Sequence, residues 1–131
     1  MALTRVINEG IGLASAIAGE GTATTNLQQG LLKAWHRADG DASTVAFNDS
    51  FNFGSITDNG TGDYTSTFTN AMDNANYSVS VESDMGGGNG GFNAISKSGT
   101  SASAVRTFSF TDAGSSRDVD PIMLMTAGDL A

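Results

Sequence analysis

Residues 63–69 read DYTSTFT, and this stretch decides the fold class. Tyr64 and Phe68 occupy even positions, whereas threonine occupies the odd positions from 65 to 69. Because successive side chains of a β-strand point to opposite faces of a sheet, this alternation predicts a strand with one apolar and one polar face. Residues 77–81, YSVSV, repeat the pattern and predict a second strand.

Shorter stretches of the same kind lie on both sides of these two strands. Together they predict seven strands, near residues 31–37, 45–47, 51–53, 64–69, 77–81, 108–110 and 119–126. Turn-forming residues separate the strands, and the Asn-Gly pair at 59–60 is typical of a hairpin turn. About seven short strands in roughly 100 residues predict an all-β fold, an antiparallel β-sandwich.

The last of these stretches, residues 119–126, reads VDPIMLMT and differs from the others. Its segment 122–125 is apolar on both faces, which favours a strand buried between layers or between subunits. Pro121 would stand at the start of this strand, where its missing N–H group costs little.

The composition limits the classes of protein to which the chain can belong. Its 131 residues allow one ordinary domain with a short appendage, which excludes a multidomain enzyme. Fourteen acidic and six basic residues give a net charge of −8, so nucleic acid or an anionic membrane surface would repel the chain. The chain has no cysteine, and no apolar run approaches the roughly 20 residues of a membrane span. We therefore expect neither nucleic-acid binding nor membrane insertion.

The N-terminal segment differs from the rest of the chain. Residues 19–26, GEGTATTN, have the composition of a linker, so we predict an arm and linker at 1–26 and a body at 27–131. The arm is expected to be a short helix or an extended segment that orders only against sister chains or a docking surface. No secretory signal is recognised at its start, and synthesis in the cytoplasm is expected. The apolar residues predicted to anchor the arm are Leu3, Val6, Ile7, Ile11 and Ile17.

Residues 86–91 read GGGNGG and formally satisfy the GxGxxG pattern of dinucleotide sites. That pattern requires a helix directly after it, and residues 92–100 have no helical period. We predict a hairpin loop between the fifth and sixth strands, either a plain flexible connection or an exposed tip that contacts a partner. Residues 58–63, DNGTGD, carry oxygen ligands but lack the glutamate that closes a calcium loop, so a turn is favoured.

The side chains that could support catalysis are few. Asp39 and Asp41, like Asp118 and Asp120, are separated by one residue and could serve as acid and base, although solvated loops explain such pairs as well. His36 is the only histidine, no GxSxG elbow occurs, and a surface or interface position is expected for its imidazole. The sequence therefore predicts a protein that is not an enzyme and that needs no metal or cofactor.

Several segments of the body resemble a module of tailed-bacteriophage fibre proteins, found in tail, neck or head fibres. The resemblance covers about residues 27–81 well and is looser in the C-terminal third. The segments that carry it are LQQGLLKAW at 27–35, DSFN at 49–52, SITDNGTGDYT at 55–65, AM at 71–72 and NYSV at 76–79.

The resemblance implies a virion protein: a homotrimeric β-sandwich knob whose N-terminal arm docks to a phage head, collar or tail structural protein. The distal loops would face a glycan or protein of the host surface. The expected trimer seam comprises Leu31, Trp35, Ile122 and Leu124. The expected receptor-facing loop comprises Gly86, Asn89, Phe92 and Asn93.

Three other functions remain open at the level of the sequence. One is a capsid decoration or head fibre without a receptor role, and another is a free carbohydrate-binding module. The third is a glycan depolymerase, which would need two carboxylates in a cleft. For any sugar contact, the aromatic candidates are Trp35, Tyr64, Tyr77 and Phe92, with Phe92 favoured because it borders the glycine-rich segment.

Overall fold

The computed structural model describes residues 16–18, 24–26, 31–84 and 91–131, and the chain divides into two units, residues 1–31 and 32–131. In the first unit, β1 (Ala16–Ala18) pairs antiparallel with β2 (Thr24–Asn26). Strand β2 occupies part of the predicted linker, because its two β-branched threonines suit an extended backbone. Ile17 of the predicted arm lies in β1, whereas Leu3, Val6, Ile7 and Ile11 lie outside the described residues.

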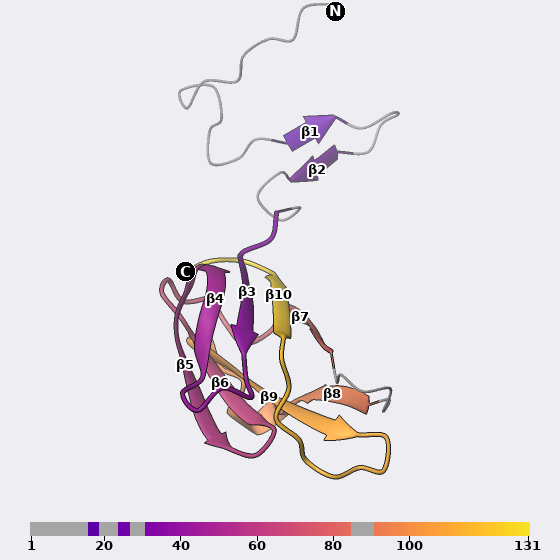
Figure 1. Ribbon diagram of the computed structural model, residues 1–131. Helices are drawn as coiled ribbons and strands as arrows, with labels where there is room; N and C mark the ends of the chain where they lie inside the picture. Colours follow the sequence, from indigo (N-terminus) through magenta and orange to yellow (C-terminus); the bar gives the residue numbers. More distant parts are fainter. Residues whose placement is uncertain (1–15, 19–23, 27–30, 85–90) are drawn as a thin grey trace, which may run out of the picture. The chain divides into compact units, whose positions relative to one another are not determined.

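The second unit is a sandwich-like all-β fold built from two four-stranded antiparallel sheets (Figure 1). One sheet has the strand order β4-β3-β10-β7, and the other has the order β5-β6-β9-β8. The strands are β3 (Ala34–Asp39), β4 (Ala46–Phe51), β5 (Phe53–Gly60), β6 (Asp63–Phe68), β7 (Ser78–Ser83), β8 (Gly91–Ile95), β9 (Ala104–Thr111) and β10 (Ile122–Ala127). A short 3-10 helix, η2 (Lys97–Gly99), follows β8. The predicted all-β class is confirmed.

Strand β6 has the alternation that its sequence predicts. Tyr64, Ser66 and Phe68 are buried, and the residues between them are only partly covered. The turn predicted within residues 58–63 occurs at Thr61-Gly62, since β5 ends at Gly60 and Gly60 pairs with Asp63 at the start of β6. Gly60 and Gly62 both have positive φ angles, 133° and 68°, which explains why this tight connection uses glycine.

Strands β8 and β9 carry aromatic side chains on their outer face and polar side chains on their inner face. Thr107 and Ser109 of β9 are buried, whereas Phe108 and Phe110 alternate with them and face outward. On β8, the Asn93 amide oxygen accepts hydrogen bonds from the Ser83 and Ser109 hydroxyls, at 3.1 and 2.9 Å. A polar group that faces inward is tolerated when it is hydrogen-bonded, and these bonds satisfy the amide oxygen of Asn93. The sequence predicts no strand at β8, because the inward-facing Asn93 is polar.

The prediction of a hairpin between the fifth and sixth strands is wrong. Strand β7 is an edge strand of one sheet, and β8 is an edge strand of the other. The connection between them therefore joins the two sheets and does not form a hairpin between neighbouring strands. The glycine-rich residues 86–90 lie outside the described residues.

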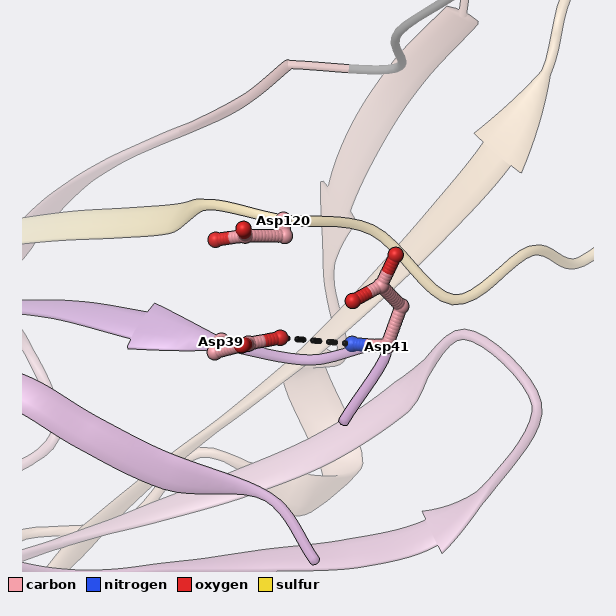
Figure 2. Close-up of side chains that lie close together, drawn as sticks. All are labelled: Asp39, Asp41 and Asp120. Carbon is pink, nitrogen blue, oxygen red and sulfur yellow. Dashed lines mark hydrogen bonds between the residues drawn. The ribbon is translucent and has the colours of Figure 1, made fainter. Parts of the chain in front are cut away.

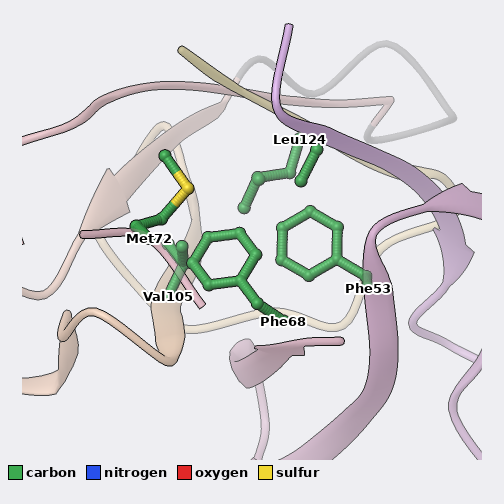
Figure 3. Close-up of a cluster of buried hydrophobic side chains, with 6 residues drawn as sticks. Phe53, Phe68, Met72, Val105 and Leu124 are labelled. Atoms are coloured by element: carbon green, nitrogen blue, oxygen red, sulfur yellow. The ribbon is translucent and has the colours of Figure 1, made fainter. Parts of the chain in front are cut away.

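Apolar side chains from both sheets form the core (Figure 3). Phe53 and Phe68 of one sheet stack with ring centroids 4.7 Å apart, and Leu124 of the other sheet packs in the same cluster. A second cluster contains Tyr64, Val119 and Ile122. Gly40 is required beside this cluster, because an added Cβ would lie 2.6 Å from Ile122 Cδ1 and 2.7 Å from the Val119 oxygen.

The two-faced strand near the C-terminus is central in its sheet, and only one of its faces is buried. In β10, Ile122 and Leu124 are each 1 % exposed, whereas Met123 and Met125 are 38 % and 46 % exposed. The placement of Ile122 and Leu124 in a trimer seam is therefore wrong, because both side chains fill the interior of the sandwich. Pro121 directly precedes the strand, as predicted.

Leu124→Ala and Met125→Ala separate these two faces of β10. We expect Leu124→Ala to lower the free energy of unfolding by about 2–5 kcal/mol, because it leaves a cavity between the sheets. Met125→Ala should cost less than about 1 kcal/mol, since that side chain is half exposed. Urea unfolding at the lowest usable protein concentration measures both values. Equal losses would mean that both faces of β10 are buried.

Candidate functional site

The outer side of the β4-β3-β10-β7 sheet carries an exposed apolar surface. Strand register places Phe51 of β4 opposite Trp35 of β3, and Trp35 opposite Met125 of β10. Phe51 is 53 % exposed, and Trp35 is partly buried. Met123 lies two residues before Met125 on the same side of the strand. We call this surface the Trp35 face, defined by Phe51, Trp35, Met123 and Met125.

A second row of side chains lies next to the row of Phe51, Trp35 and Met125 on the same side of the sheet, and it contains charged residues. Arg37 lies opposite both Asp49 and Met123, and Met123 lies opposite Glu82 of β7. The row therefore has the order Asp49, Arg37, Met123 and Glu82 across the four strands. The contact of Arg37 with Asp120 is 3.9 Å, and both side chains are about half exposed, so it contributes little.

A shallow groove of about 240 Å³ follows the Trp35 face. It is lined by both methionines of β10, Trp35, Arg37, Ser80 and Glu82, with His36 and Leu124 beneath. Methionine and tryptophan present large apolar areas, and methionine adapts its shape to irregular partners. Such a surface is suited to docking.

A second aromatic surface lies on the outer side of the other sheet. Phe92 of β8 is 51 % exposed and stacks on Phe110 of β9, with ring centroids 5.1 Å apart. Phe108 lies 6.1 Å from Phe110, and the Arg106 guanidinium lies 5.3 Å from the Phe108 ring centre. We call Phe92, Phe108, Phe110 and Arg106 the Phe92 patch.

An ion pair borders the Phe92 patch. Arg106 Nε donates to Asp63 Oδ1 at 2.8 Å, and a second guanidinium nitrogen contacts the other carboxylate oxygen. The hydrogen bonds from Arg106 lower the pKa of Asp63 below its usual value. Two parallel bonds hold the guanidinium in a fixed plane beside the rings.

The predicted receptor-facing residues do not share one environment. Phe92 is exposed, as expected, but Asn93 is partly buried and is hydrogen-bonded to two serines. The assignment of Asn93 to a receptor-facing surface is wrong, because its side chain points between the sheets. Gly86 and Asn89 lie outside the described residues.

The aromatic candidates for sugar contact also differ in exposure. Tyr64 is fully buried, and its hydroxyl donates to the Gly40 oxygen or to Asp118 Oδ1, at 2.9 and 2.8 Å. Tyr77 is partly buried, its hydroxyl lies 2.8 Å from the Ser101 carbonyl oxygen, and burial raises its pKa to about 12. Among the four predicted aromatics, Trp35 and Phe92 present their rings on outer faces of the sandwich.

Three carboxylates gather where β3 ends and β10 approaches (Figure 2). One carboxylate oxygen from each of Asp39, Asp41 and Asp120 lies within 4.8 Å of the other two, close enough for the three to hold a metal ion together. Asp39 Oδ1 accepts from the backbone N–H groups of Asp41 and Ala42, an arrangement that closes the turn after β3. A hydrogen bond to Asp39 raises the pKa of Asp41, and nearby negative charges add to the shift. Turn formation thus explains the position of the Asp39 carboxylate, and Asp120 lies near Arg37.

The second aspartate pair of the sequence is divided between two structural roles. Asp118 Oδ1 accepts from the Gly62 N–H at 2.7 Å and lies 2.8 Å from the Tyr64 hydroxyl, so it fastens the β5–β6 turn to the body. Asp120 instead faces Arg37. The two carboxylates therefore have different partners.

His36 is not at a surface or interface, contrary to the expectation from the sequence. Its side chain is 2 % exposed between the rings of Phe47 and Phe53, with both centroids 4.9 Å away. Nε2 is hydrogen-bonded to the Ser66 hydroxyl at 2.9 Å, which links the two sheets. Nδ1 has no hydrogen-bond partner within the described part of the chain. Burial lowers the pKa of His36 to about 4, although the nearby Ile122 backbone partly opposes the shift.

Comparison with protein-family models, curated proteins and solved structures finds no match. In the described residues, no helix is both long enough and apolar enough to span a membrane.

Titration of His36 tests its placement in the core. Because folding lowers this pKa from 6.5 to about 4, the free energy of unfolding should fall as the pH decreases from about 6.5 to about 4. The loss from this group should approach about 3 kcal/mol and then level off. His36→Gln should remove this part of the acid sensitivity, which urea unfolding across the pH range would measure.

NMR gives a direct measurement, because the chain contains one histidine. The imidazole Cε1–H resonance of the native protein should titrate near pH 4. A midpoint at pH 6 or above would contradict a buried neutral imidazole.

Proposed function

We propose that this protein is a structural virion protein, a short trimeric fibre of a tailed bacteriophage. Residues 1–26 would dock to a head, collar or tail structural protein, and the sandwich would project for attachment to the host surface. Two observations support the proposal. Residues 27–81 resemble fibre modules, and the body of the protein is all-β, as that resemblance implies.

The attachment role depends on one observation, the exposure of the Phe92 patch. A half-exposed ring backed by a second stacked ring presents a rigid apolar plane, and further along β9 Asp63 holds the Arg106 guanidinium over the Phe108 ring. Such a plane can stack on the C–H face of a sugar or on a protein side chain. Attachment of this kind needs no deep pocket, because weak contacts repeated over three subunits and several fibres give avidity.

Phe92→Ala tests the attachment role. The variant should still be incorporated into particles, because Phe92 lies outside both core clusters, and adsorption to host cells should fall at least about tenfold. Ile95→Ala is the matched control, since Ile95 is also exposed on β8 but has the opposite strand parity. Unchanged adsorption of assembled Phe92→Ala particles would favour a capsid decoration or head fibre without a receptor role.

Deletion of residues 1–19 tests docking by the arm. The truncated chain should retain the circular dichroism spectrum of the sandwich, because all eight strands of the second unit lie beyond the deletion. It should be absent from purified particles. Incorporation at the normal copy number would show that docking uses another part of the chain.

A further inference from the structure

We propose that the Trp35 face is the surface by which copies of this chain associate with one another. This inference rests on the proposed function for its expected stoichiometry, three copies around one axis, but its physical basis is the surface itself. It replaces the predicted seam residues Ile122 and Leu124, which are buried, with Met123, Met125 and Phe51, and it retains Trp35.

The residue types of the Trp35 face are those of an interface core. Phe51, Met123 and Met125 are each more than one third exposed, and Trp35 lies between Phe51 and Met125. Trp, Phe, Met and Arg are enriched at interface cores relative to the rest of protein surfaces. A monomer that leaves these side chains together in water forgoes the hydrophobic stabilisation that burial provides.

The charges of the face indicate a second copy of the chain as the occupant. Each copy has a net charge of −8, so association requires a region where the repulsion is locally offset. Arg37 provides a positive charge between Asp49 on β4 and, beyond Met123, Glu82 on β7. A rotated copy can place its Glu82 or Asp49 against Arg37 and its own Arg37 against an acid of the next copy. The row is therefore self-complementary.

Arg37 and Glu82 do not satisfy each other within one chain. They lie on β3 and β7, which are separated by β10, so their backbones are about 10 Å apart. The contact that Arg37 makes with Asp120 is long and exposed. Asp49 lies opposite Arg37 on the neighbouring strand, but Arg37 and Glu82 are both exposed, so both charges can contact another copy.

Light scattering on the full chain over a range of concentrations, together with tryptophan fluorescence, tests the proposal. The wild type should have a mass of three times 13.3 kDa at the higher concentrations. Trp35 is the only tryptophan, so its emission should shift to shorter wavelength as the face becomes covered at higher concentration. A monomer with constant emission at all concentrations would overturn the proposal.

Met125→Glu places a negative charge in the centre of the face and should weaken association at least about tenfold, with the circular dichroism spectrum retained. Phe92→Glu adds the same charge on the other sheet and should leave the mass unchanged. An oligomer that persists in Met125→Glu and is lost in Phe92→Glu would assign association to the Phe92 patch. That result would overturn this inference without deciding whether the protein is a fibre.

If Met125→Glu does not fold, reversing the charges of Arg37 and Glu82 tests the same interface. Arg37→Glu and Glu82→Arg should each weaken association, and the double variant should recover most of it, because the reversed pair can form again between copies. Equal mass in all three variants and the wild type would overturn the pairing. The adsorption of Phe92→Ala particles is an independent measurement, so a failure of the proposed attachment role can be distinguished from a failure of this interface.

Discussion

The packing of Ile122 and Leu124 against the opposite sheet is the constraint on which the rest of the structure depends. Leu124 shares a cluster with Phe53 and Phe68, and Ile122 shares one with Tyr64, so both clusters span the two sheets. Because side chains alternate along a strand, anchoring these two residues inward turns Met123 and Met125 outward. The same constraint therefore builds the core and creates the Trp35 face.

Buried polar groups set a second condition, since they link the sheets at fixed positions. The His36 ring is hydrogen-bonded to Ser66, Tyr64 reaches Asp118 and the Gly40 carbonyl, and Asn93 is bonded to serines of both sheets. Such bonds add little net stability, but leaving any of these groups unpaired would be costly. They therefore favour one relative placement of the sheets over others with equal apolar burial.

The two outer faces of the sandwich differ in the chemistry they present. The Trp35 face combines flexible methionines with charges of both signs, whereas the Phe92 patch combines stacked rings with a guanidinium that is already paired to Asp63. The first suits association between copies, and the second suits contact with a foreign surface. Since the faces belong to different sheets, self-association through one leaves the other free to act.

The sequence by itself determined the all-β class, a turn within residues 58–63, and the inward face of β6, because period-two alternation and positive-φ glycines are local signals. It did not determine which face of β10 points inward. Residues Ile122–Met125 are apolar at every position, so their sequence contains no alternation of apolar and polar residues that could distinguish the two faces. It also left the inward face of β9 undetermined and predicted no strand at β8, where Ser109 and Asn93 face inward because they can hydrogen-bond to each other. Only the tertiary structure supplies those partners, so only it decided which side chains form the core and which form the two candidate binding surfaces.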